Sequence, residues 1–195
     1  MQGSPYPNAP PAPSGSKFPI WLIIILAVLG LGVVLVGVLA ALGVYGTRRY
    51  LAAAKTAEAK NSVGAIARGA RYGFEMERPD GSHKLCGSAV AVPAMVPSAK
   101  KYLPATGADF DTGDAENGWK CLKFSMTTPI YYQYHYNRGA GYLAPAASPG
   151  PTGFEAAARG DLDGDGTTSL FALTGKESGG ALTVSTSVYI ENEFE

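Results

Sequence analysis

The acidic segment 161–169 carries the residue types and the spacing in this chain that are best suited to chemistry. Asp161, Asp163 and Asp165 alternate along it, and carboxylates at alternate positions of a loop converge on one hard cation, as they do in calcium-binding loops. Thr167 would add its backbone carbonyl, and Ser169 stands at the next alternate position. We therefore expect a calcium ion with a structural role at this loop.

The acidic loop lacks the bidentate glutamate that completes an EF-hand, because Ala172 stands at that position. Glu191 or Glu193 would close the coordination shell if the last strand lies beside the loop. The alternative is an Asp-Gly turn that is stabilised by hydrogen bonds from the backbone to the aspartate side chains. Three carboxylates within one short loop repel one another without a cation, and this favours calcium.

The sequence contains no recognisable catalytic motif. His83 and His135 have no zinc-ligand spacing around them, and we expect both to be surface side chains. There is no Gly-x-Ser-x-Gly, no phosphate-binding Walker loop and no dinucleotide-binding fingerprint. We expect that the protein is not an enzyme, and the sequence identifies no small-molecule substrate.

The chain has two cysteines, Cys86 and Cys121, and both follow the long apolar run at residues 18–46. Each could formally pair with a histidine as a nucleophile, and a reduced thiol pair is a further alternative. One disulfide in an oxidising compartment is more common for a domain next to a membrane anchor. A disulfide between Cys86 and Cys121 would close the chain between them into a loop and stabilise the domain by about 3 to 4 kcal/mol in the chain-entropy model.

Charge is distributed unevenly although the formal net charge is zero. Residues 47–78 hold seven Lys and Arg against three Glu, whereas residues 160–195 hold seven acids against Lys176 alone. An acidic end with one basic residue argues against nucleic acid as a partner and favours cation binding or simple solvation.

Residues 18–46 form a run of 29 residues without a charged side chain. As a helix this run would be about 43 Å long, enough to cross a hydrocarbon core of about 30 Å. A cleavable signal has a much shorter apolar region. We expect one transmembrane helix, preceded by a disordered, proline-rich segment at residues 1–17. Small residues let neighbouring helices approach closely, and the candidates for lateral packing are Gly30, Gly37, Ala41 and Gly43.

Helical periodicity continues beyond the span, through residues 47–78. Apolar residues recur there at spacings of three and four and would line one face: Val63, Ile66, Ala67, Ala70 and Phe74. The alanine-rich composition favours a helix, and the Pro-Asp-Gly sequence at residues 79–81 ends it.

The segment from Val38 to Lys60 resembles the first helix of type IV pilins and pseudopilins, in which an apolar half leads through small residues and a basic step into an alanine-rich half. The segments 160–166 and 189–193 resemble a subgroup of bacterial pilin-like envelope proteins. The resemblance implies that the apolar half-helices bundle and that the amphipathic half packs on an antiparallel sheet. It also implies a structural subunit of a bacterial surface filament, or of its assembly or secretion machinery, that associates with itself or with other pilin-like subunits.

The chain departs from the pilin pattern at its leader. In that family the leader is cut after a glycine, and a glutamate follows at the fifth mature position. Here Phe18 follows Lys17, the nearest glycine is Gly15, and the fifth position from Phe18 is Leu22. The alternative function is therefore a permanently membrane-anchored, non-polymerising extracytoplasmic binding domain that calcium stiffens.

The direction of the span is argued from opposing features. Arg48, Arg49 and Lys55 follow it and only Lys17 precedes it, so the positive-inside rule alone would put the large domain in the cytoplasm. The cysteine pair, the acidic loop and the pilin resemblance favour the outside. We expect a bacterial inner-membrane protein with its amino terminus in the cytoplasm and its C-terminal domain outside it.

Residues 79–195 are expected to form a β-rich domain, because several segments beyond residue 85 alternate in polarity as half-buried strands do. The expected strands are 122–126, 130–136, 154–159, 169–174 and 182–190, with a hairpin loop at 176–180 and exposed loops at 92–118 and 138–153. Tyr132, Tyr134 and Tyr136 would share one face of a strand, and we expect them in the core rather than on a carbohydrate-binding surface. The expected fold is α+β and pilin-like, with a long N-terminal helix packed on an antiparallel β-sheet.

Overall fold

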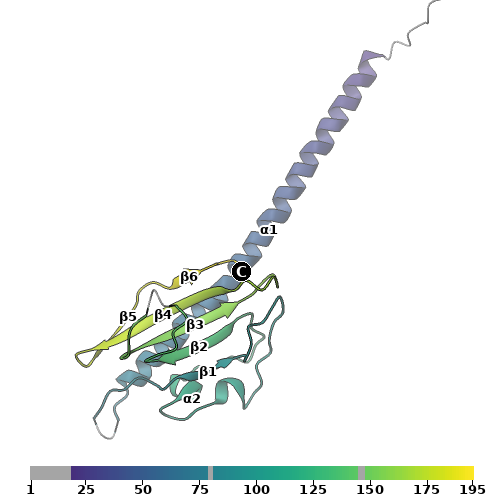
Figure 1. Cartoon of the computed structure of the whole chain (residues 1–195). Coiled ribbons are helices and arrows are strands. Elements are labelled where there is room, and N and C mark those ends of the chain that lie inside the picture. The colour runs from purple at the N-terminus through teal and green to yellow at the C-terminus, as the bar shows by residue number, and fades with distance from the viewer. Residues whose placement is uncertain (1–18, 79–80, 145–147) are drawn as a thin grey trace, which may run out of the picture. The chain divides into compact units, whose positions relative to one another are not determined.

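The computed structural model describes residues 19–78, 81–144 and 148–195 (Figure 1). Residues 1–17, where we expect disorder, lie outside the described residues. The chain divides into two compact units, Met1–Thr47 and Arg48–Glu195, and each is described by itself. The fold is α+β, with a long N-terminal helix and an antiparallel sheet.

Helix α1 (Ile20–Glu75) is continuous and contains no proline. Its first part is the one stretch of the described residues that is long and apolar enough to cross a membrane, with a mean hydropathy of 3.2 over 18 residues. The apolar side chains there are exposed within the single chain, as Val33 and Leu39 illustrate. The structure therefore contains one candidate membrane anchor, as the uncharged run predicts.

The sheet of the second unit is antiparallel, in the order β1-β2-β3-β4-β5, and β6 also pairs with β4. Its strands are β1 (Ala89–Val92), β2 (Gln133–Arg138), β3 (Gly153–Gly160), β4 (Ser169–Ser178), β5 (Ala181–Val184) and β6 (Tyr189–Glu191). Two short helices, η1 (Asp109–Asp111) and α2 (Gly118–Leu122), lie between β1 and β2 in the sequence.

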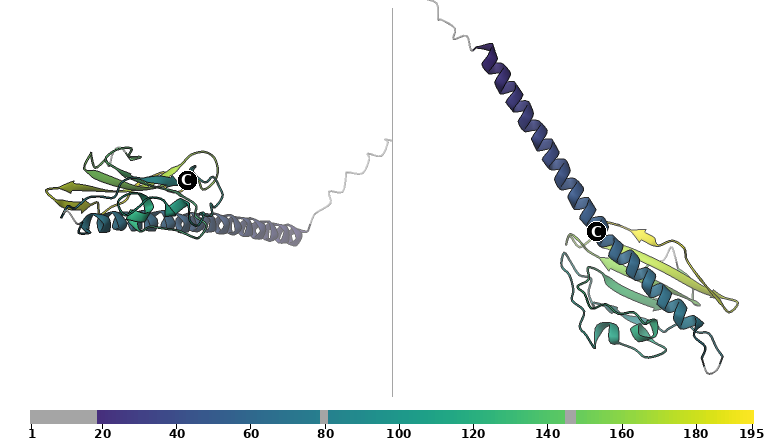
Figure 2. Two further views of the ribbon diagram at one scale, coloured as in Figure 1. Left: turned by 90° about the horizontal axis from the view of Figure 1, so that it is seen from below. Right: turned by 180° about the vertical axis from the view of Figure 1, so that it is seen from behind.

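The second part of α1 covers one face of this sheet (Figure 2). The predicted helix face is confirmed, because Val63, Ile66 and Ala70 are completely buried and Ala67 and Phe74 nearly so. Periodicity of 3.6 residues brings these side chains to one side of the helix, where they enter the core.

The core under α1 combines large side chains on β2 with small ones on β3. Tyr134 and Tyr136 of β2, and Tyr132 directly before the strand, are fully buried, so they are core residues, as expected, and not a carbohydrate platform. Ala156 and Ala158 of β3, also fully buried, leave room for the aromatic rings on either side. The ring of Tyr132 packs edge-on against Phe171 of β4 at a centroid distance of 5.7 Å.

The strand predicted at 122–126 is wrong. Residues Gly118–Leu122 form α2, and Lys123 ends the helix in the left-handed conformation, with φ of 50°. The helical turn buries Trp119, whose indole nitrogen donates to the Val90 carbonyl at 2.8 Å. This tertiary packing determines the local structure, whereas the alternation of Leu122 and Phe124 with polar residues coincides with a strand pattern.

The other strand predictions are right in part. The strand predicted at 154–159 is confirmed by β3, and the one at 169–174 is the first part of β4, which continues to Ser178 through the predicted hairpin loop. The turn itself is at Gly179 and Gly180, which both have positive φ. The strand predicted at 182–190 is two strands, because β5 and β6 pair with different parts of β4. The strand predicted at 130–136 begins later, at Gln133.

Two glycines of α1 allow neighbouring segments of the chain to contact the helix backbone closely. A Cβ at Gly69 would collide with the carbonyl of Leu122, and a Cβ at Gly73 would lie 2.5 Å from Sγ of Cys86. Gly64, on the same helix, has only a side-chain atom of Arg68 at 3.5 Å. Glycine is thus required at Gly69 and Gly73 and not at Gly64.

We expect Gly69→Ala and Gly73→Ala to lower the free energy of unfolding by about 1 to 3 kcal/mol, since the added methyl group collides with the Leu122 backbone in one variant and with Sγ of Cys86 in the other. Gly64→Ala, the matched control, should raise it by about 0.5 to 1 kcal/mol through helix propensity alone. Urea titration of the full chain in detergent, followed by tryptophan fluorescence, measures both effects. Equal stability of all three variants would contradict the close packing.

Candidate cation-binding loop

The acidic loop connects the end of β3 to the start of β4, and the residues that flank it, Gly160 and Ser169, are paired with each other in the sheet. The backbone N–H groups of Gly164 and Gly166 donate to the Asp161 carboxylate at 2.7 and 3.3 Å, and Thr167 N–H donates to Asp165 at 2.6 Å. Gly164 and Gly166 have φ of 85° and 91°, which a loop this tight requires. These bonds hold the aspartates in place by local chain geometry.

The three predicted carboxylates are brought together. Asp161, Asp163 and Asp165 each place a carboxylate oxygen within 4.8 Å of the others. Asp161 is buried while Asp163 and Asp165 are exposed, so the cluster opens to solvent on one side. Hydrogen bonds from Thr167 lower the pKa of Asp165 and keep its carboxylate ionised. This donor set fits a hard cation such as calcium, and the same backbone bonds are also those of an Asx turn.

The remaining predicted ligands make other contacts. Ser169 is buried and its hydroxyl donates to the Gly160 carbonyl at 3.2 Å, while Thr167 is exposed. Glu193 forms an ion pair with Lys60 of α1 at 2.5 Å, and Glu191 accepts a bond from Tyr189 at 3.4 Å. Neither glutamate belongs to the cluster of three carboxylates.

Glu195 is the acid that lies near the loop, and the sequence prediction missed it. Burial first, and then the negative charges of Asp163, Asp165 and Asp161, raise the pKa of Glu195. The only sequence signal is the alternation of three glutamates at 191, 193 and 195. Which of them faces the loop depends on the path of the chain after β6.

The predicted disulfide is confirmed. Cys86 and Cys121 are bonded, with their Cα atoms 5.8 Å apart. The bond joins the segment after α1 to the end of α2, directly beside Gly73. It therefore fixes the segments that cover the end of the helix, rather than any part of the acidic loop.

Glu58 of α1 makes contacts with the sheet that the sequence did not predict. Its Oε1 accepts the N–H of Tyr131 at 3.0 Å and the hydroxyl of Tyr134 at 3.1 Å. Burial and the charge of Glu58 raise the pKa of Tyr134, so its hydroxyl stays protonated and continues to donate. The bond pair links α1 directly to the chain entering β2.

A second buried carboxylate holds a loop on the opposite face of the sheet. Glu155 of β3 is completely buried and accepts the N–H groups of Leu143 and Ala144 at 2.7 and 2.9 Å. Ala144 packs there against Ala157 and Ala172. Glu155 thus satisfies the backbone of a loop that covers the outer face.

His135 is half-buried, which corrects the expectation of a surface side chain, whereas His83 is exposed, as expected. Nε2 of His135 lies 2.7 Å from Oε1 of Gln133, whose amide nitrogen donates to the Pro93 carbonyl. Nδ1 of His83 lies 3.0 Å from the Phe74 carbonyl. Both rings therefore have structural partners.

The candidate packing residues of the apolar segment lie on α1. A Cβ at Gly30, Gly37 or Gly43 would meet nothing within 4 Å, and Ala41 is exposed. These positions are open within the single chain. Their use in lateral association stays a prediction.

Comparison of the chain with protein-family models, with curated proteins and with solved structures found no match. The resemblance to pilins therefore remains an inference from the motifs in the sequence.

His135 predicts a pH dependence of stability. Burial, and then the charge of Arg159, lowers the pKa of His135 to about 4. Between that pKa and the unfolded value of about 6.5 the unfolded state binds more protons, so stability falls as the pH falls through this window, by about 3 kcal/mol at most. Urea titrations of the full chain between pH 7 and pH 4 measure the loss.

His135→Gln removes the titrating ring and should flatten the stability curve between about pH 6.5 and pH 4. His83→Gln is the matched control and should leave the slope in place. An unchanged slope in His135→Gln would mean that other groups cause it.

Proposed function

We propose that the chain is a pilin-like structural subunit of a bacterial surface filament or of its assembly machinery. The observation that carries the proposal is that the two parts of α1 differ in composition and in burial. The helix is uncharged and exposed through its first part, and it buries one apolar face under a sheet in its second part. One helix of this kind can join a bundle in lipid and support a domain in water.

The composition of the apolar part supports lateral packing. Association of helices in lipid depends on close van der Waals contact, which small residues permit. Gly37 and Ala41 are one helical turn apart on one face of α1, and nothing in the chain fills the space beside Gly37. We propose that this face meets the same face of another copy or of a related subunit.

The second unit supports an extracytoplasmic location of the domain. Its disulfide between Cys86 and Cys121 suits an oxidising compartment. The proposed orientation has the amino terminus in the cytoplasm and the sheet outside the membrane. The loops on the outer face of the sheet then meet the surroundings or neighbouring subunits.

The full chain in lipid vesicles should self-associate, and Gly37→Leu or Ala41→Leu should weaken association by about tenfold, because the bulky side chain separates the helices. Gly32→Leu lies on the other side of the helix and is the matched control. Energy transfer between labelled copies, over a range of protein-to-lipid ratios, measures the association.

A second measurement looks for the chain in fractions sheared from the cell surface and identifies it there by its intact mass. Subunits of a filament are recovered in the sheared fraction. A chain that is monomeric in vesicles and missing from every sheared fraction would contradict the filament proposal and favour the second candidate.

The second candidate function is a permanently anchored domain that does not polymerise and that calcium stiffens. The observation that favours it is the convergence of three carboxylates within 4.8 Å. In this proposal Asp161, Asp163 and Asp165 hold the ion and the loop between β3 and β4 becomes rigid. The loop carries no cysteine, lysine or histidine, and the role of the ion in this proposal is structural.

When the calcium concentration is ten to a hundred times the dissociation constant, calcium should raise the free energy of unfolding by about 1.5 to 3 kcal/mol. EDTA should remove this gain. Asp163→Asn should abolish the effect. Asp114→Asn is the matched control, since Asp114 is an exposed aspartate that accepts backbone N–H groups in another turn. Thermal melting that is unaffected by calcium in the parent chain would reduce the loop to a turn.

A further inference from the structure

A row of three side chains crosses the outer face of the sheet at one register position. Arg159 of β3 is paired with Leu170 of β4, and Leu170 is paired with Glu191 of β6. Directly paired residues of an antiparallel sheet point to the same face. Because neighbouring strands are about 4.8 Å apart, the Cα atoms of Arg159 and Glu191 are separated by about 10 Å.

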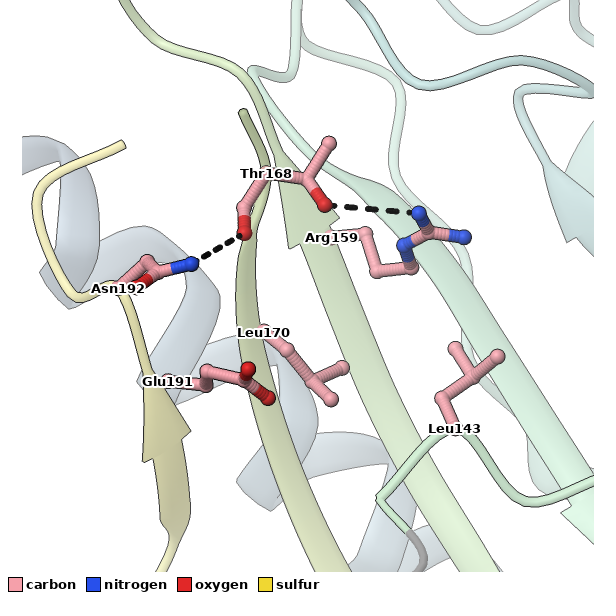
Figure 3. Close-up of a pocket in the computed structure, with 6 residues that line it drawn as sticks. All are labelled: Leu143, Arg159, Thr168, Leu170, Glu191 and Asn192. Carbon is pink, nitrogen blue, oxygen red and sulfur yellow. Dashed lines mark hydrogen bonds between the residues drawn. The ribbon is translucent and has the colours of Figure 1, made fainter. Parts of the chain in front are cut away.

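These three residues line a cavity of about 400 Å³. Leu143, from the loop that Glu155 holds, lies beside them, and Thr168 and Asn192 complete the wall (Figure 3). In the close-up, the guanidinium of Arg159 and the carboxylate of Glu191 lie on opposite sides of the Leu170 side chain. The cavity therefore has a cationic end, an apolar middle and an anionic end.

Arg159 lacks an anionic partner among the described residues. It is half-buried, and the one hydrogen bond found for it there goes to the neutral hydroxyl of Thr168, at a long 3.4 Å. No ion pair of the described chain includes it. Residues 145–147, which follow the covering loop, are Pro, Ala and Ala and carry no acid.

A half-buried guanidinium with most of its five N–H donors unfilled favours an anion from outside the chain. His135 is close enough to Arg159 for that charge to lower its pKa, but an imidazole is neutral or cationic and so does not supply an anion. Glu191 lies in the same cavity but forms no ion pair with Arg159, because Leu170 stands between them. The two opposite charges are thus available together to one ligand.

We propose that this cavity binds a small zwitterion whose two charges are separated by an apolar chain, such as an ω-amino acid. The carboxylate of the ligand accepts two hydrogen bonds from Arg159, its ammonium group contacts Glu191, and its methylene groups lie on Leu170 and Leu143. A bidentate guanidinium–carboxylate pair has the geometry and the strength for such recognition.

The test uses the full chain in detergent micelles, with carbon-13 labels on the leucine methyl groups. Three probes share a six-carbon chain: 6-aminohexanoate carries both charges, hexanoate only the anion and hexylammonium only the cation. Saturable shifts of the Leu143 and Leu170 methyl signals report binding, and empty micelles correct for partitioning. We expect 6-aminohexanoate to bind more tightly than either of the other probes.

Arg159→Gln should weaken binding of 6-aminohexanoate by about tenfold or more, as expected for loss of a charge-assisted pair. Glu191→Gln should retain hexanoate binding and lose the preference for the zwitterion. Arg68→Gln, an exposed arginine of α1, is the matched control and should bind as the parent chain does. Arg159→Lys keeps the charge without the bidentate fork and should give an intermediate affinity.

Unchanged methyl signals from the core establish that each variant is folded, and Arg159→Lys serves if Arg159→Gln is not. Equal affinity of hexanoate and 6-aminohexanoate for the parent chain would overturn the zwitterion proposal. Binding of 6-aminohexanoate by both Arg159 variants as tightly as by the parent chain, or saturation by none of the probes, would overturn the site itself. None of these outcomes depends on whether the chain enters a filament.

Discussion

The packing of the second part of α1 on the sheet is the contact on which the rest of the second unit depends. The sheet places large aromatic rings against the helix, and the helix packs on them with small buried residues such as Ala59, Ala67 and Ala70. Small side chains let the helix axis approach the sheet closely, so that the tyrosine hydroxyl of β2 reaches Glu58 at 3.1 Å. The acidic loop and the outer cavity both stand on strands that this contact orders.

Patterns that one element carries by itself could be predicted from the sequence. The 3.6-residue period of Val63, Ile66 and Phe74 predicts the buried face of α1, and alternation predicts β3. The same alternation misleads at Leu122 and Phe124, because the burial of Trp119 and the bond of Cys121 favour a helical turn there. Local pattern is a sound guide where packing agrees with it and fails where packing overrides it.

The candidate site divides in the same way. The convergence of Asp161, Asp163 and Asp165 follows from their spacing in one loop, so the sequence contains it. The neighbouring acid is Glu195, and its place depends on how the chain leaves β6. Glu155 meets its partners twelve and eleven residues away across a loop, and Arg159 meets Leu170 and Glu191 only through strand register. Sequence spacing alone does not encode register.

The edges of the sheet are short. On one side β1 has four residues and departs from regular register with β2, and on the other side β4 is covered by β5, of four residues, and β6, of three. An unpaired edge recruits further strands only where it offers a run of free backbone groups. With edges this brief, a neighbouring copy has little backbone to add a strand to. The sheet is consequently protected against cross-β aggregation, even when many copies are crowded together in one plane.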